Sequence, residues 1–187
     1  RLKYLEKKSY LFVLAFLLIF SANAAFAETI AANTLPTNPV IINGSAVISQ
    51  NSNTLTVNQN SDKLITNWSS FNIGSDATVQ FNQPSSTSSA LNRVNSSDPS
   101  YIFGTLRANG QVFLINPNGV LFGNGARVDV GALFASSLNI KDSDYLNNDY
   151  VFEKNVVNPG SVSNYGDINA FSGGTVAFIA PQINNEG

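Results

Sequence analysis

One stretch decides the fold: Gln111-Val112-Phe113-Leu114-Ile115-Asn116-Pro117-Asn118-Gly119-Val120-Leu121-Phe122. Its centre is a turn, because Pro117 fixes φ at the second position of a type I turn, Asn118 suits the third, and Gly119 accepts the positive φ that often follows. The runs on either side are apolar at consecutive positions, which is typical of strands covered by a core on one face and partly by further chain on the other. The stretch therefore predicts strand, turn and strand in a stacked β architecture.

Alternating polarity predicts strands elsewhere in the chain. Around Arg127 and Asp129, which face one side as a charge pair, three small or apolar residues face the other side: Ala126, Val128 and Val130. Ala77, Val79 and Phe81 alternate with Thr78 and Gln80 in the same way. Helical periodicity is scarce, so strands carry this domain.

Asparagine is unusually frequent, with 26 Asn against 13 Gly, while charged residues make up only 12%. Asn favours turns, and its side-chain amides form ladders when the same turn recurs one layer up. The tripeptides Asn164-Tyr165-Gly166 and Asn185-Glu186-Gly187 are 21 residues apart. Three strands of about five residues joined by short turns fill such a period, which predicts one coil of a solenoid.

Several segments depart from this coil pattern. The short strands expected at Pro39–Ile42, Ala46–Ser49 and Leu55–Val57 would cap the open first coil. The segment Leu138–Pro159 interrupts the period and predicts a lateral excursion, with a single helical turn at Asp142–Leu146 capped by Asp142 or Ser143. The Ser- and Asn-rich stretch Gln83–Ser100 is interpreted as a surface loop.

The amino terminus has the pattern of a secretory signal peptide. Basic residues in the first eight positions precede an apolar run, Tyr10–Phe20, which is too short for a bilayer core that needs about twenty residues. Small residues then stand at the two positions that a signal peptidase reads, Ala25 and Ala27. We expect cleavage before Glu28, with residues 1–27 as signal and residues 28–187 as one domain that continues beyond Gly187.

Composition argues against several functional classes. From Glu28 onward six Lys or Arg stand against eleven Asp or Glu, a net charge of −5 that does not suit nucleic-acid binding. The chain has no His and no Cys, so the usual general base and the usual zinc ligands are missing. Asp142 and Asp144 form a close acidic pair, which we interpret as two solvated carboxylates in an exposed loop. We expect no enzyme, no cofactor and no metal site.

Three motifs give a family resemblance. The stretch Gln111–Gly123, continued by Ala126–Gly131 and Ala135-Ser136, resembles the amino-terminal secretion domain of the filamentous haemagglutinin family, the passengers of two-partner secretion (TPS). Asn67–Gly74 and Ala90–Val94 resemble the same domain in the same order. This chain departs from the family at Asn82-Gln83-Pro84, where many members have a second Asn-Pro-Asn turn.

The resemblance implies an all-β fold, a right-handed parallel β-helix of the single-stranded, pectin-lyase-like kind, with an amino-terminal β cap and extra strands packed alongside. It also implies an outer-membrane β-barrel transporter as partner, whose periplasmic domains bind extended segments by strand addition. The residues that the resemblance assigns to recognition or to the structural turn are Asn116, Pro117, Asn118, Gly119, Asn67, Trp68, Phe71, Asn72, Asn92 and Arg93.

The functional prediction follows from this resemblance. The chain is expected to be the secretion-signal domain of a large exoprotein, carried by Sec to the periplasm of a Gram-negative bacterium and released to the cell surface or medium, where residues beyond Gly187 would meet a host surface. Absence of Cys suits either a chain threaded unfolded through a pore or a β core that needs no disulfide. Trp68 is interpreted as core rather than recognition anchor. The alternative is a self-contained adhesin or carbohydrate-binding module.

Overall fold

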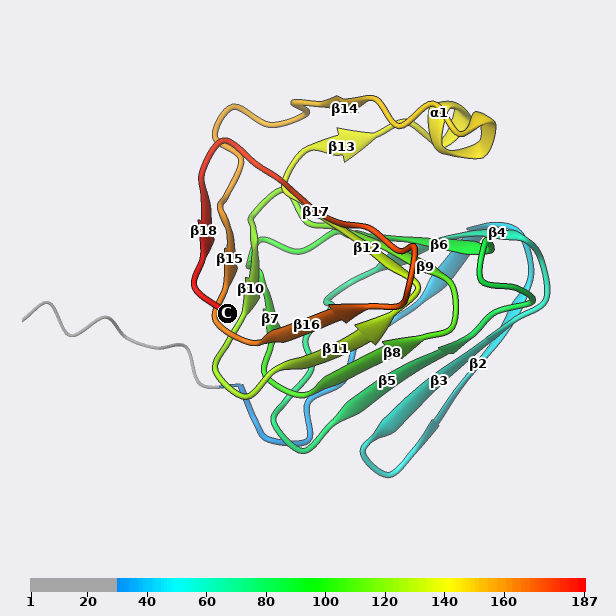
Figure 1. The fold of residues 1–187 in the computed structure, drawn as a ribbon, viewed down its shortest axis with the longest axis horizontal. Helices are drawn as coiled ribbons and strands as arrows, with labels where there is room; N and C mark the ends of the chain where they lie inside the picture. The colour runs from blue at the N-terminus through cyan, green and yellow to red at the C-terminus, as the bar shows by residue number, and fades with distance from the viewer. Residues whose placement is uncertain (1–29) are drawn as a thin grey trace, which may run out of the picture.

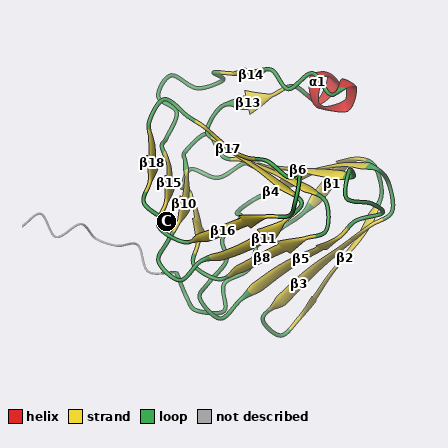
Figure 2. Ribbon diagram, viewed as in Figure 1, coloured by secondary structure: helices red, strands yellow, loops and turns green. Residues whose placement is uncertain are grey.

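The computed structural model describes residues 30–187, which wind as a parallel β-solenoid (Figure 1). The predicted cleavage site at Ala25, Ala27 and Glu28 lies outside the described residues. One short helix stands among the strands (Figure 2), and no helix within residues 30–187 is long and apolar enough to cross a membrane. The prediction of an all-β solenoid is confirmed.

Five coils follow one another along the stack, and we number them from the amino terminus. Coil 1 contains β3 (Thr54–Gln59) and β4 (Lys63–Trp68). Coil 2 contains β5 (Thr78–Asn82), β6 (Ser89–Val94) and β7 (Ser100–Ile102). Coil 3 contains β8 (Thr105–Ala108), β9 (Gln111–Ile115) and β10 (Val120–Phe122). Coil 4 contains β11 (Arg127–Val130), β12 (Ala132–Ser136) and β15 (Val162–Asn164), and coil 5 contains β16 (Asp167–Ala170), β17 (Val176–Ile179) and β18 (Ile183–Asn185).

The coils stack into three sheets, each named here after its strand in coil 3. The β9 sheet has the order β1-β4-β6-β9-β12-β17, the β8 sheet β16-β11-β8-β5-β3-β2, and the β10 sheet β18-β15-β10-β7. Pairing between coils is parallel, so equivalent positions lie above one another, as Asn67, Arg93 and Ile115 do in the β9 sheet. Residues far apart in sequence therefore meet as layers of one column.

Two antiparallel strands cap the first coil, as predicted for Pro39–Ile42 and Ala46–Ser49, whereas the expected cap strand Leu55–Val57 belongs to coil 1 itself. Strand β1 (Val40–Asn43) pairs with β4, and β2 (Ala46–Asn51) pairs with β3, both antiparallel. Gly44, between the two strands, has a φ of 82°. The antiparallel direction interrupts the parallel register and ends the stack at this side.

The main core fills the inside of the solenoid. The predicted alternation is confirmed: Ala126, Val128 and Val130 are buried, as are Ala77, Val79 and Phe81. Arg127 lies on the outer face, where its Nε is 3.0 Å from Asp129 Oδ2. The apolar side chains inside the coils thus bury one face of each strand, and this burial drives the winding.

The lateral excursion is observed at the predicted place and covers the outside of the β9 sheet. It contains β13 (Asn139–Ile140), α1 (Asp142–Asn147) and β14 (Phe152–Glu153), with β13 and β14 antiparallel (Figure 1). A second apolar cluster lies beneath it: Ile65, Leu91, Phe113, Ile115, Ile140 and Tyr145. This second cover explains why β9 is apolar at consecutive positions.

Two local predictions are wrong. Helix α1 has Lys141 as its N-cap, without a side-chain cap hydrogen bond, and Ser143 Oγ contacts Asp144 Oδ1 instead. The stretch Gln83–Ser100 is not a surface loop, because it contains the largely buried strand β6 and ends at the start of β7. Its polar composition misled the prediction, since polar side chains such as Asn92 are buried with hydrogen-bond partners.

The corners of the coils are tightly stacked, and glycine makes this possible. At the corner between the β8 and β9 sheets, a Cβ on Gly131 would lie 2.6 Å from the carbonyl oxygen of Gly110, and one on Gly174 would lie 2.0 Å from that of Gly131. Amide ladders also occur, as predicted, because Asn164 Nδ2 donates to Asn185 Oδ1 over 2.9 Å. The glycine column spans coils 3 to 5, and the amide pair joins coils 4 and 5.

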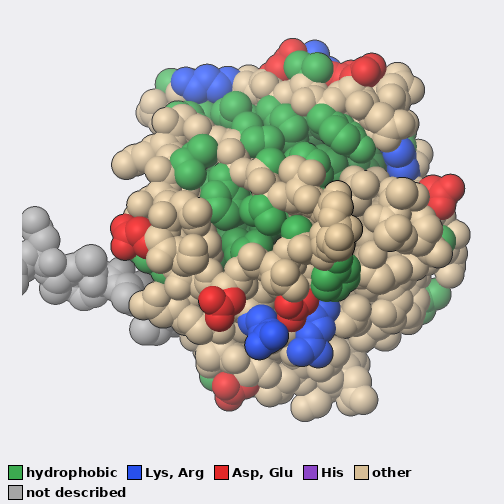
Figure 3. Space-filling view, viewed as in Figure 1, with side chains coloured by type: hydrophobic (Ala, Val, Ile, Leu, Met, Phe, Trp, Pro, Cys, Tyr) green, Lys and Arg blue, Asp and Glu red, His purple; other side chains and the backbone are tan. Residues whose placement is uncertain are grey.

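The carboxyl-terminal end of the stack exposes strand edges and apolar side chains. Strands β16, β17 and β18 are each terminal in their sheets. Figure 3 shows apolar side chains gathered over the middle of the face viewed in Figure 1. Three apolar side chains of coil 5 are almost half exposed: Phe171, Val176 and Ile183.

Candidate functional site

The three motifs form successive layers at one corner of the solenoid, between the β9 and β10 sheets. The first motif includes the end of β4 in coil 1, the second includes β6 in coil 2, and the third includes β9 and the turn after it in coil 3. Parallel pairing of β4 with β6 and of β6 with β9 places their ends side by side. The structure therefore brings together segments that are about 25 residues apart in sequence.

The Asn116–Gly119 turn closes this corner in coil 3. The amide of Gly119 donates to the carbonyl of Asn116 over 2.9 Å, and Gly119 has a φ of 113°, as the sequence predicts. Asn116 Oδ1 accepts from the amide of Asn118 over 3.0 Å, the hydrogen bond of an Asx turn. Pro117 stands between them with its side chain half-buried.

The side chains of this turn also reach the preceding coil. Asn116 is fully buried, and its Nδ2 donates to the carbonyl of Asp98 over 3.0 Å and to Ser100 Oγ over 3.1 Å. Asn118 is exposed, and its Nδ2 donates to the carbonyl of Ser96 over 2.6 Å. One asparagine thus fixes the corner from within, and the other fixes it from the surface.

Trp68 and Asn92 join coils 1 and 2 inside the core. Trp68 is 1% exposed, and its Nε1 donates to Asn92 Oδ1 over 3.0 Å. Asn92 Nδ2 contacts the carbonyls of Ala90 and Phe113, so this one amide bridges three coils. The ring of Phe71 meets that of Trp68 edge to face at 5.4 Å between centroids. The prediction that Trp68 lies in the core is confirmed.

The remaining predicted residues have different surroundings. Asn72 Oδ1 accepts from the amide of Tyr101 in coil 2 over 2.8 Å. Within residues 30–187, the buried Oδ1 of Asn67 has no hydrogen-bond partner. Arg93 contacts the lateral excursion instead of the corner, and its Nη2 is 2.8 Å from Asp142 Oδ1. Arg93 therefore acts on another part of the domain.

Burial distinguishes a structural role of these motifs from recognition by a partner. The side chains of Trp68, Phe71, Asn92 and Asn116 are at most 1% exposed. A folded domain shows solvent only the rim of this corner, with Asn118 as its exposed amide. A partner can read the buried side chains only before the coils have paired.

Sequence reasoning missed several residues that hold the excursion or join coil 1 to coil 2. Lys63 Nζ lies 2.6 Å from the carbonyl of Tyr145, and burial lowers the pKa of Lys63. Burial, as its largest cause, raises the pKa of the Tyr145 phenol, whose oxygen is 2.7 Å from Ser89 Oγ. Gln83, in the segment that departs from the family, donates to Gln59 Oε1 and joins coils 1 and 2. The sequence carries no local signal for these contacts, because they join residues 24 to 82 positions apart.

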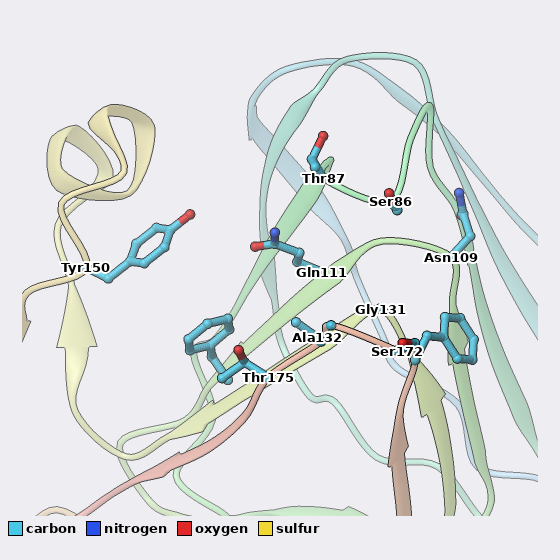
Figure 4. A pocket seen from close by; sticks show the side chains of 13 residues that line it. Ser86, Thr87, Asn109, Gln111, Gly131, Ala132, Tyr150, Ser172 and Thr175 are labelled. Atoms are coloured by element: carbon cyan, nitrogen blue, oxygen red, sulfur yellow. The ribbon is translucent and has the colours of Figure 1, made fainter.

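A groove of about 370 Å³ lies where the excursion overhangs the β9 sheet (Figure 4). Tyr150 points towards it from the excursion, opposite Gln111 and Thr175. Phe134 and Phe171 also line it, and Gly131, Gly173 and Gly174 leave its floor without side chains. Its lining carries aromatic rings, hydroxyls and amides but no charged group. Within residues 30–187, no group of three or more His, Cys, Asp or Glu is placed to hold a metal ion.

Comparison with known proteins identifies the family of this fold. Residues 27–187 match the family described as the TPS secretion domain. The secretion domain of HMW1 from Haemophilus influenzae has a similar structure, with a TM-score of 0.75 and 31% sequence identity, over 81% of this chain and 41% of that one.

Two heme/hemopexin-binding proteins of Haemophilus influenzae are similar in sequence. One, from strain ATCC 51907 / DSM 11121 / KW20 / Rd, is 39% identical over 111 residues, and the other is 40% identical over 100 residues. These matches span 59% and 54% of this chain but only 12% and 11% of those proteins. The match over nearly the whole length from residue 27 shows that the chain belongs to the TPS secretion domain family, the secretion domains of large exoproteins.

Proposed function

We propose that residues 28–187 are a secretion signal that a partner outer-membrane β-barrel transporter recognises before the domain folds. Residues 1–27 direct Sec export and are removed before Glu28, and the periplasmic domains of the transporter bind the extended chain. The coils then form at the cell surface or in the medium of a Gram-negative bacterium. The domain has no catalytic role and needs no cofactor, metal or nucleic acid. Membership of the TPS secretion domain family supports the partner transporter.

The burial of the motif side chains is the observation that carries this proposal. Asn116, Trp68 and Asn92 lie inside the coils, where no partner of a folded domain can touch them. These buried side chains can act in recognition only on an unfolded chain. The recognition set is Asn116, Pro117, Asn118, Gly119, Asn67, Trp68, Phe71, Asn72 and Asn92, with Arg93 as a further member.

Strand addition supplies a physical route for recognition. An unpaired β9 or β10 offers a row of backbone N–H and C=O groups to a sheet edge, and its alternate side chains give selectivity. After passage the same groups pair with β6, β12, β7 and β15 of the chain itself. Each formed coil presents edges on which the next coil can pair, as β16, β17 and β18 do at the end of this stack. Folding outside then biases movement outward without nucleotide hydrolysis.

Co-expression with a partner transporter tests the proposal. A Gram-negative host expressing this chain with a transporter encoded beside it should release the domain into the medium, and a host without the transporter should retain it in the periplasm. The matched control is a transporter that lacks its periplasmic domains. Equal release with and without the intact transporter would contradict the proposal.

The alternative function is a self-contained adhesin or carbohydrate-binding module, and the uncharged groove beneath Tyr150 favours it. Aromatic rings and amides are suited to the faces and hydroxyls of neutral sugars. The two functions differ in a simple readout. A module of this kind binds its ligand when folded and needs no transporter, whereas a secretion signal is defined by transporter-dependent release.

A further inference from the structure

The lateral excursion connects coils that are not neighbours in the stack. In a solenoid each coil contacts only the next, so stability spreads stepwise. The excursion leaves the solenoid after β12 in coil 4, and its helix α1 contacts Lys63 in coil 1. We infer that residues 138–159 form a clasp that closes last over the β9 sheet and locks coils 1 to 4 into one cooperative unit.

Arg93 of coil 2 holds the amino-terminal side of the clasp. Its Nε donates to Asn139 Oδ1 over 3.0 Å, and its Nη2 donates to the carbonyl of Ile140 over 2.7 Å and to Asp142 Oδ1 over 2.8 Å. The Arg93 side chain is only 17% exposed. Three charge-assisted hydrogen bonds with little access to water make a firm attachment.

Lys63 of coil 1 holds the carboxyl-terminal side of the clasp. Its Nζ donates to the carbonyls of Tyr145 and Leu146 over 2.6 and 3.0 Å, and to Asn148 Oδ1 over 2.7 Å. These groups belong to the last turn of α1 and its C-cap, where the negative end of the helix dipole favours a cation. All three donors of the ammonium group therefore point at the end of the helix.

Tyr145 covers the outer face of the β9 sheet between Lys63 and Arg93. Its side chain is fully buried, and its hydroxyl contacts Ser89 Oγ and the carbonyl of Leu64. Beneath the clasp lie Ile65, Leu91 and Phe113, one from each of coils 1, 2 and 3. Removing the clasp would uncover apolar side chains on three successive coils at once.

Sequence separation sets the order of closure. Contacts between the clasp and the two cations join residues 46 to 85 positions apart. The strands of coils 1 to 3 and strands β11 and β12 of coil 4 pair with the coil before them over about 20 to 27 residues, so their loops cost less entropy to close. The clasp also needs β4, β6 and β9 already in place as its base. Coils 1 to 3 and strands β11 and β12 of coil 4 therefore pair first, and the clasp closes on them afterwards.

Urea kinetics on the purified chain, without any transporter, test this order. Lys63→Met and Arg93→Met should each unfold at least about tenfold faster, while their refolding rates stay within about twofold of the parent, because contacts formed after the transition state act on unfolding. Lys154→Met is the matched control, because Lys154 is an exposed cation of the same clasp. It should leave both rates within about twofold of the parent.

Three results would overturn the inference. Refolding that slows by as large a factor as unfolding accelerates would place the clasp in the early folding nucleus. Unchanged unfolding rates in both variants would show that the clasp does not couple the coils. If either variant fails to fold, Ser89→Ala, which removes only a hydroxyl partner of Tyr145, is judged by the same criterion. In hydrogen exchange the amides of β4 should lose protection in Lys63→Met, and retained protection would contradict the coupling. A role of the clasp in preventing backward movement during export rests on the proposed function, but the kinetic test does not.

Discussion

The substitution Asn116→Ala tests how far the corner of coil 3 depends on one buried amide. It removes the hydrogen bonds to the Asp98 carbonyl, to Ser100 Oγ and from the amide of Asn118. At about 0.5 to 1.5 kcal/mol for each hydrogen bond, the free energy of unfolding should fall by roughly 1.5 to 4.5 kcal/mol. Asn118→Ala is the matched change, because it removes a single hydrogen bond at an exposed site and should cost about 0.5 to 1.5 kcal/mol.

Urea unfolding of the purified chain, followed by far-ultraviolet circular dichroism, measures both losses. The two variants should keep the parental m-value, so that the shift in midpoint reports stability alone. Equal losses for Asn116→Ala and Asn118→Ala would refute the reasoning, because burial and the number of hydrogen bonds would then not determine the contribution of each amide.

Export of the same variants separates recognition from stability. Gly131→Ala provides a reference with a comparable loss, since its Cβ would lie 2.6 Å from the Gly110 carbonyl, a clash expected to cost about 1 to 3 kcal/mol. We expect Asn116→Ala and Asn118→Ala to be released into the medium less than Gly131→Ala, at equal periplasmic synthesis. If release follows stability alone across the three variants, the turn has a structural role only.

Three further predictions concern individual side chains. Gly119→Val should lower the free energy of unfolding by about 1 to 3 kcal/mol and reduce release, because a φ of 113° strains any other residue; release at the parental level would argue against a role for the turn. Trp68→Phe leaves the buried amide of Asn92 without its donor and should cost about 1 to 3 kcal/mol in urea, whereas a cost near zero would mean that water replaces the indole. Burial raises the pKa of Tyr145 above 10.0, so the unfolded chain loses the phenol proton first and the free energy of unfolding should fall as pH rises above 10. Tyr145→Phe should flatten that fall. The lowered pKa of Lys63 acts in the opposite sense, and it does so in both proteins.

Much of the fold could be predicted because the pattern is local. Pro117 and Gly119 specify their turn within four residues, and the alternation from Ala126 to Val130 reports one buried face. The apolar run of β9 correctly indicated a second cover, although only the structure identifies that cover as α1 and the strands beside it.

What the sequence could not reveal depends on pairing between coils. Asn92 lies in a polar stretch, and its burial is understandable only once Trp68 and the carbonyl of Phe113 lie beside it. Lys63 and Arg93 look like isolated surface cations until the clasp, 46 to 85 residues later, meets them. The type of a residue is known from the sequence, but its exposure depends on which coil lies above it.

A reversible cross-link between two coils tests most directly whether export precedes folding. The chain has no Cys, so Asn58→Cys and Asn82→Cys would introduce a single pair at exposed positions that are partners in β3 and β5, about 4.8 Å apart as in neighbouring strands. The measurement is the amount of domain released into the medium with the transporter present, with and without reductant, and with each single Cys variant as control. We predict that release is blocked when the disulfide forms and returns with reductant. Equal release of the cross-linked and reduced domain would contradict recognition and passage of an unfolded chain.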